Sequence, residues 1–77
     1  MKSPKRKILR ECEKVLGQAG ISIVNRQAEK LFIDLDTASK EDVQKLANAI
    51  AQNAVILVGR QRAGAVKESL IGIANRM

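Results

Sequence analysis

The residues best suited to chemistry form a short segment near the end of the chain, Gly59-Arg60-Gln61-Arg62-Ala63-Gly64. It follows an apolar run and precedes a stretch of helical periodicity, which is the strand-to-helix position at which many proteins hold a phosphate. The two glycines let a ligand approach the backbone, and N–H groups at a helix start can donate hydrogen bonds to phosphate oxygens. The side chains of Arg60 and Arg62 could bind the same oxygens. One interpretation is therefore an anion-binding loop at Gly59 and Gly64. The other is a flexible turn with solvated arginines.

The same segment does not favour nucleotide hydrolysis. A Walker loop needs Lys and then Ser or Thr directly after its second glycine, where this chain has Ala65 and Val66. The chain also has no histidine, no tyrosine and no thiol with an evident activator, so acid–base or nucleophilic catalysis has few candidates. We therefore expect no enzyme activity, no catalytic residue, and no metal or cofactor.

A second pattern is the run Leu31-Phe32-Ile33-Asp34-Leu35-Asp36-Thr37, in which an apolar segment ends in Asp-x-Asp. Over this run the chain resembles the first motif of the haloacid-dehalogenase-type phosphotransferases, where one carboxylate attacks phosphorus and the other handles the leaving group. That family places its threonine one position later, and its chemistry needs a lysine, further acidic metal ligands and a much longer domain. A structural role is favoured, with Asp34 facing solvent on a strand and Asp36 and Thr37 leading into a helix.

The basic residues gather at the two ends of the chain. Residues 1–14 carry six Lys/Arg against two Glu, residues 56–77 carry four against one, and the formal net charge of the whole chain is +6. If the two ends meet in the fold, one face is basic, and such a face attracts polyanions, of which nucleic acid is the commonest. A solvated surface that promotes solubility is the alternative. The residues predicted to contact nucleic acid are Lys5, Arg6, Lys7, Arg10, Lys14, Arg60, Arg62 and Lys67.

Hydrophobic periodicity divides the chain into six predicted elements. The first predicted helix runs from about Pro4 to Leu16, with Ser3 as its N-cap and Gly17 and Gly20 as its stop. The second runs from a capping box at Ser39 and Asp42 to about Asn53, with an apolar stripe of Val43, Leu46, Ala47, Ile50 and Ala54. The third follows the 59–64 segment and ends at Met77. Strands are predicted at 21–24, 30–36 and 54–58, the first two forming a hairpin around a turn at 25–29. The run at 54–58 is apolar throughout, which is typical of a strand buried on both faces. The expected fold is a single α/β (α+β) domain over residues 1–77. It would be a two-layer sandwich of order α-β-β-α-β-α, with a three-stranded sheet that contains a β-hairpin and one parallel crossover.

A domain of this size has a thin stability margin, and a single cysteine with no histidine leaves self-association as the remaining reinforcement. Cys12 lies on an apolar helical stripe and is predicted to be a core residue. If all helices cover one face of the sheet, Phe32 and Val24 stay open on the other and form an interface. A helix on each face is the alternative. No stretch is apolar enough to span a bilayer, and a cytoplasmic location is expected.

Three functions remain as hypotheses. The first is a small basic nucleic-acid-binding protein, a regulator or accessory subunit, that binds DNA or RNA mainly through phosphates. The second is an interaction module that forms a homodimer or docks on an acidic protein partner through Phe32 and Val24, without binding nucleic acid. The third is an enzyme or small-anion binder that uses the 59–64 segment.

Overall fold

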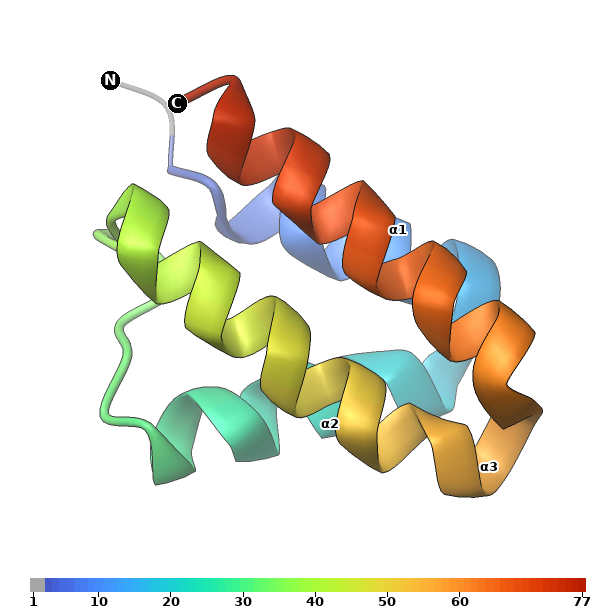
Figure 1. Ribbon diagram of the computed structural model, residues 1–77. Coiled ribbons are helices and arrows are strands. Elements are labelled where there is room, and N and C mark those ends of the chain that lie inside the picture. Colours follow the sequence, from blue (N-terminus) through green and yellow to red (C-terminus); the bar gives the residue numbers. More distant parts are fainter. Residues whose placement is uncertain (1–2) are drawn as a thin grey trace.

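Helices make up the regular structure of residues 3–77, which are the residues that the computed structural model describes. They are α1 (Lys5–Leu16), α2 (Gln18–Lys30) and α3 (Lys40–Asn75). Because α3 folds back on itself at Gly59, four helical rods lie around one core (Figure 1). We call residues 40–58 the N-terminal arm of α3 and residues 60–75 its C-terminal arm. The predicted α/β sandwich with a three-stranded sheet is therefore wrong, since no strand occurs within residues 3–77.

The first helix confirms the prediction for the segment from Pro4 to Leu16. The Ser3 hydroxyl accepts a hydrogen bond from the backbone N–H of Lys5 at 3.1 Å, which satisfies one of the free donors at the start of α1. Ile8 and Cys12, one turn apart, are fully buried. Gly17 ends the helix with a φ of 69° and donates its N–H to the carbonyl of Glu13 at 2.8 Å.

The second helix replaces the predicted strand at 21–24 and the predicted turn at 25–29. Val24, Gln27 and Ala28 are buried, and their spacing of three and four residues places them on one side of a helix. Gly20 is buried where α2 turns back against the end of α1, close to the backbone of Cys12. The β-branched residues of this segment therefore pack from a helix.

The end of α2 overturns the predicted strand at 30–36. Ile33 donates its N–H to the carbonyl of Ala28 at 2.9 Å and Phe32 donates to Glu29 at 3.2 Å, the two hydrogen bonds of a Schellman motif. Phe32 occupies the position that this motif usually gives to glycine, with a φ of 56°. Beyond it, the Asp34 carboxylate accepts the N–H of Asp36 at 2.9 Å, so Asp34 is exposed as predicted but shapes a turn rather than a strand.

Replacing Phe32 by glycine should raise the free energy of unfolding by about 1 kcal/mol. A left-handed backbone costs an L-residue roughly 1–2 kcal/mol, and glycine adopts it freely, although glycine also gains entropy in the unfolded chain. The phenyl ring is 96% exposed, so little packing is lost with it. Urea denaturation of Phe32→Gly beside Phe32→Ala, which removes the ring but keeps Cβ, isolates the backbone effect. Equal midpoints for the two variants would contradict it.

The third helix begins as predicted. The Ser39 hydroxyl accepts the N–H of Asp42 at 3.1 Å and the Asp42 carboxylate accepts the N–H of Ser39 at 3.2 Å, which completes a capping box. The helix does not end at Asn53, whose side-chain amide donates to the carbonyl of Ala49 within a continuing helix. The predicted strand at 54–58 is therefore wrong, because this run is the last part of the N-terminal arm. The predicted apolar stripe is confirmed by the burial of Val43, Leu46, Ala47, Ile50 and Ala54.

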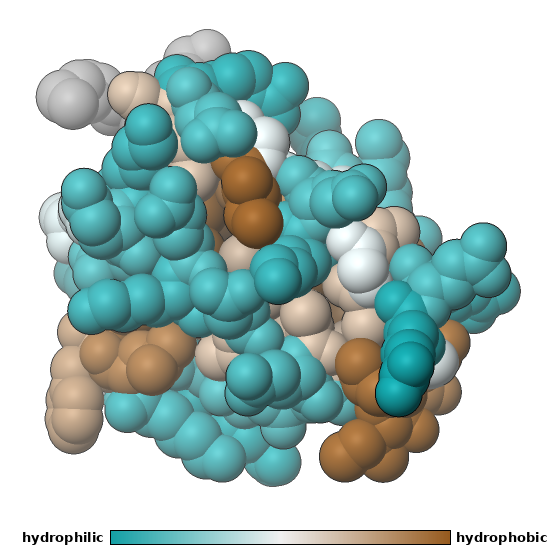
Figure 2. Space-filling model, in the orientation of Figure 1, coloured by the Kyte–Doolittle hydropathy of each residue, from teal (hydrophilic) through white to brown (hydrophobic). Residues whose placement is uncertain are grey.

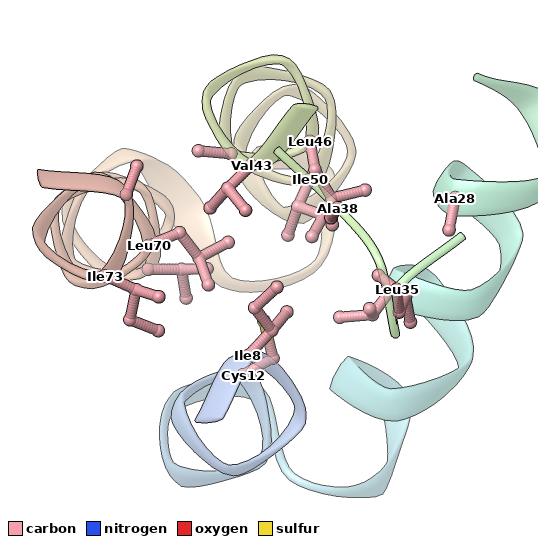
Figure 3. Packing of buried hydrophobic residues seen from close by; sticks show 14 residues of the cluster. Ile8, Cys12, Ala28, Leu35, Ala38, Val43, Leu46, Ile50, Leu70 and Ile73 are labelled. Carbon is pink, nitrogen blue, oxygen red and sulfur yellow. The ribbon is translucent and has the colours of Figure 1, made fainter. Parts of the chain in front are cut away.

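The four rods share one hydrophobic core, seen in Figure 3. Ile8 and Cys12 of α1 point toward Leu70 and Ile73 of the C-terminal arm, while Ile50 reaches in from the N-terminal arm. Burial raises the pKa of the Cys12 thiol to about 12, with a further contribution from the Glu11 carboxylate, so the thiol stays protonated near neutral pH. The prediction that Cys12 is a core residue is confirmed.

Across the described residues, no helix has both the length and the apolar composition to cross a membrane.

Candidate functional site

The two basic ends of the chain lie together in the fold. The C-terminal arm of α3 runs beside α1 (Figure 1), and the side chains of Ile8 and Cys12 meet those of Leu70 and Ile73 between them. The two ends of the chain therefore meet in the fold, which is the condition for one basic face.

The charge of the molecule is divided unequally between two halves of the bundle. The basic half, defined as residues 5–16 and 60–76, carries nine Lys/Arg against three Glu. All other residues of the chain carry five Lys/Arg against five Asp/Glu, so the formal net charge of +6 belongs to the basic half. Every Lys and Arg side chain of the basic half is exposed. Summed over so small a surface, these charges give a potential that favours polyanions.

Within α1, the exposed cations cover the side that faces away from the core. Lys7, Arg10 and Lys14 follow each other at spacings of three and four residues and are exposed, whereas Ile8 and Cys12 are fully buried. These three cations therefore share one exposed face of α1.

A hollow of about 750 Å³ lies at the start of α1 and contains most of the predicted N-terminal cations. Four of its lining residues are cations and one is a carboxylate, that of Asp36, which accepts a hydrogen bond from the Ser3 hydroxyl at 3.0 Å. With four cations against one carboxylate, the hollow carries a net positive charge. The residues that line it are Ser3, Lys5, Arg6, Lys7, Leu9, Arg10 and Asp36.

A second, smaller hollow of about 260 Å³ lies between the two arms of α3. Arg60 and Lys67 line it from the C-terminal arm, with Gly64 between them at helical spacing, and Asn48 and Gln52 line it from the N-terminal arm. Its described lining contains no carboxylate, so it suits an anionic group. The two amides are not among the residues predicted from the sequence, because their place beside Arg60 and Lys67 depends on the reversal of the chain at Gly59.

The predicted anion-binding loop at 59–64 has a different form in the structure. Gly59 alone leaves the helical conformation, with φ 85° and ψ 171°, and Gly64 lies inside the C-terminal arm. Arg60 and Arg62 are separated by about 200° around the helix axis, so they face different sides. The two arginines therefore do not point toward one phosphate over the two glycines, and Arg60 instead lines the smaller hollow together with Gly64 and Lys67.

The two residues predicted to form an interface, Phe32 and Val24, do not lie on one surface. Val24 is fully buried among the helices, whereas Phe32 is 96% exposed at the end of α2. With no sheet in the described chain, the two side chains have no common face.

The structure thus brings the predicted basic residues into one half of the bundle, along α1 and along the C-terminal arm. Within residues 3–77, no three His, Cys, Asp or Glu side chains come together as metal ligands.

Comparison of the chain with protein-family models, with curated proteins and with solved structures finds no match in any of the three.

Proposed function

We propose that this protein binds nucleic acid, duplex DNA or structured RNA, through phosphate contacts made by the basic half. The observation that carries the proposal is that the whole formal net charge of +6 lies on the basic half, where α1 packs against α3. Cations spread along neighbouring helices match a ligand whose negative charges repeat along a backbone. The phosphate contacts are assigned to Lys5, Arg6, Lys7, Arg10, Lys14, Arg60, Arg62 and Lys67.

The dimensions of the bundle suit a duplex. Its longest extent is 33 Å. A duplex rises about 3.4 Å per base pair, so the bundle can lie along roughly ten base pairs, or one helical turn. Four to six of the phosphates in that stretch are a reasonable number for these cations to neutralise. Because backbone contacts carry no sequence information, the affinity should depend weakly on sequence.

A salt titration tests this proposal. Fluorescence anisotropy with labelled duplex DNA and duplex RNA of about 20 base pairs should give a plot of log affinity against log salt with a slope of about −4 to −5, since each neutralised phosphate contributes about −0.9. A slope near zero, or no binding at low salt, would remove the proposal. A neutral polymer with the same label serves as the control for non-electrostatic association.

A further inference from the structure

An apolar patch stands exposed at the elbow of α3. Val55, Ile56 and Leu57 form the last turn before Gly59, and their side chains are 39%, 86% and 62% exposed. Figure 2 shows this end of the molecule as a brown corner at the lower right, where the elbow lies in Figure 1. Leu57 also continues the buried stripe of Ile50 and Ala54 beyond the end of the core. The N-terminal arm therefore carries an apolar tip that no other rod covers.

The surroundings of this tip are basic. Residues 43–67 contain four Lys/Arg and no Asp or Glu. Arg60 and Val55 line the same small hollow, so a cation lies near the first residue of the tip. A binding partner for the tip must offer negative charge on its surface and an apolar interior just beneath it.

A second copy of this chain is a poor occupant. Two elbows in contact would bring Arg60 and Arg62 of both copies together with no carboxylate nearby in sequence, which is repulsive. Three aliphatic side chains also cover only a fraction of the roughly 800 Å² per partner that a stable protein interface takes. A small insertion into a ligand already held by other contacts needs no such area.

We propose that Ile56 and Leu57 act as a wedge that inserts between base pairs of duplex DNA bound by the basic half, and that the wedge kinks the duplex. This inference rests on the proposed function. A duplex presents phosphates over an apolar base stack, and aliphatic side chains that enter the minor groove unstack base steps and bend DNA by about 20–90°. Ile56 and Leu57 end the N-terminal arm, and Arg60 opens the C-terminal arm directly after the bend at Gly59, so the wedge lies next in the chain to the phosphate-binding cations Arg60 and Lys67.

The bend can be measured by energy transfer between dyes at the two ends of a DNA duplex of about 25 base pairs. Saturation with the native protein should shorten the end-to-end distance as expected for a bend of at least about 20°. The double variant Ile56→Ala/Leu57→Ala should bind with the same salt slope but leave the duplex straight. Alanine favours helix, so this variant keeps the N-terminal arm, and its far-ultraviolet circular dichroism should match that of the native protein.

The matched control is Leu31→Ala/Phe32→Ala, which removes two exposed apolar side chains at the end of α2 and should bend DNA as the native protein does. Binding without bending by the native protein would overturn the wedge and leave the proposed function standing. Absence of binding at low salt would instead remove the proposed function itself. An elbow variant that bends DNA normally but no longer sediments with phosphatidylserine vesicles would overturn the wedge in favour of a membrane-surface contact.

Discussion

Replacing Lys7, Arg10 and Lys14 together by glutamine should weaken duplex binding by 10²- to 10³-fold at about 0.1 M salt. At that salt concentration, a phosphate contact with an exponent of about 0.9 contributes roughly a factor of eight, and three contacts multiply. The salt slope should become shallower by close to three. Glutamine is a good helix former and all three positions are exposed, so α1 should keep its structure. Anisotropy titrations at several salt concentrations measure both quantities.

The control is a second triple variant that has the same net charge as the first but loses its cations from another part of the surface. Arg26, Lys30 and Lys45 are exposed on α2 and on the N-terminal arm, outside the basic half. Their joint replacement by glutamine also lowers the formal net charge from +6 by three, yet it should reduce affinity by less than tenfold and leave the slope nearly unchanged. Equal losses in the two triple variants would show that only the total charge matters, and that the position of the basic half is irrelevant.

Parts of the fold were predictable where two independent signals agreed. Ser39 and Asp42 form the capping box that their spacing indicated, and the stripe from Val43 to Ala54 is buried as its period predicted. In α1, the Ser3 hydroxyl accepts the N–H of Lys5 at the helix start, and Gly17 ends the helix. Capping chemistry and hydrophobic period gave the same answer at these positions, because both depend on contacts within a few residues.

The strand predicted at 21–24 is wrong because the intrinsic strand preference of its residues is outweighed by tertiary packing. Ile21 to Val24 are rich in β-branched residues, which favours a strand in isolation, but Gly20, Val24 and Ala28 are spaced four residues apart and are buried on one helix side. Gly20 is not part of a helix stop; it lies within α2 at the point where that helix comes closest to the backbone of α1. A period of four over nine residues was the better signal in this segment.

The strand predicted at the apolar run 54–58 is wrong for a different reason. A short continuous apolar segment fits a buried strand or a helix equally well. The prediction of a strand at 54–58 depended on burial of the segment on both faces. In the structure only Ala54 is buried, while Val55, Ile56 and Leu57 are exposed. Their exposure depends on where the chain reverses at Gly59, which is a long-range property. The basic half was foreseeable from the charge at the two ends, but Asn48 and Gln52 of the smaller hollow were not, because their position depends on that same reversal.

The contact that defines α2 is the crossing at Gly20. A Cβ built on Gly20 would lie 2.5 Å from the carbonyl oxygen of Cys12 and 2.9 Å from its carbonyl carbon, with Leu16 Cβ at 3.0 Å. Two of these three neighbours are backbone atoms, so no side-chain rotation can relieve the overlap. The ends of α1 and α2 would have to move apart, and that movement would disturb the burial of Cys12 and Val24.

Replacing Gly20 by alanine should therefore lower the free energy of unfolding by about 1–3 kcal/mol, although alanine is the better helix former. For a domain of this length, 1 kcal/mol corresponds to roughly 4–8 °C, so thermal unfolding followed by circular dichroism should show Tm falling by about 10 °C. Gly72→Ala is the matched control, because Gly72 also lies within a helix but a Cβ there would meet nothing within 4 Å. It should keep or raise Tm. Opposite shifts at Gly20 and Gly72 separate close packing from intrinsic helix preference. A rise in Tm for Gly20→Ala would mean that residues 18–30 do not pack against the end of α1 as a helix.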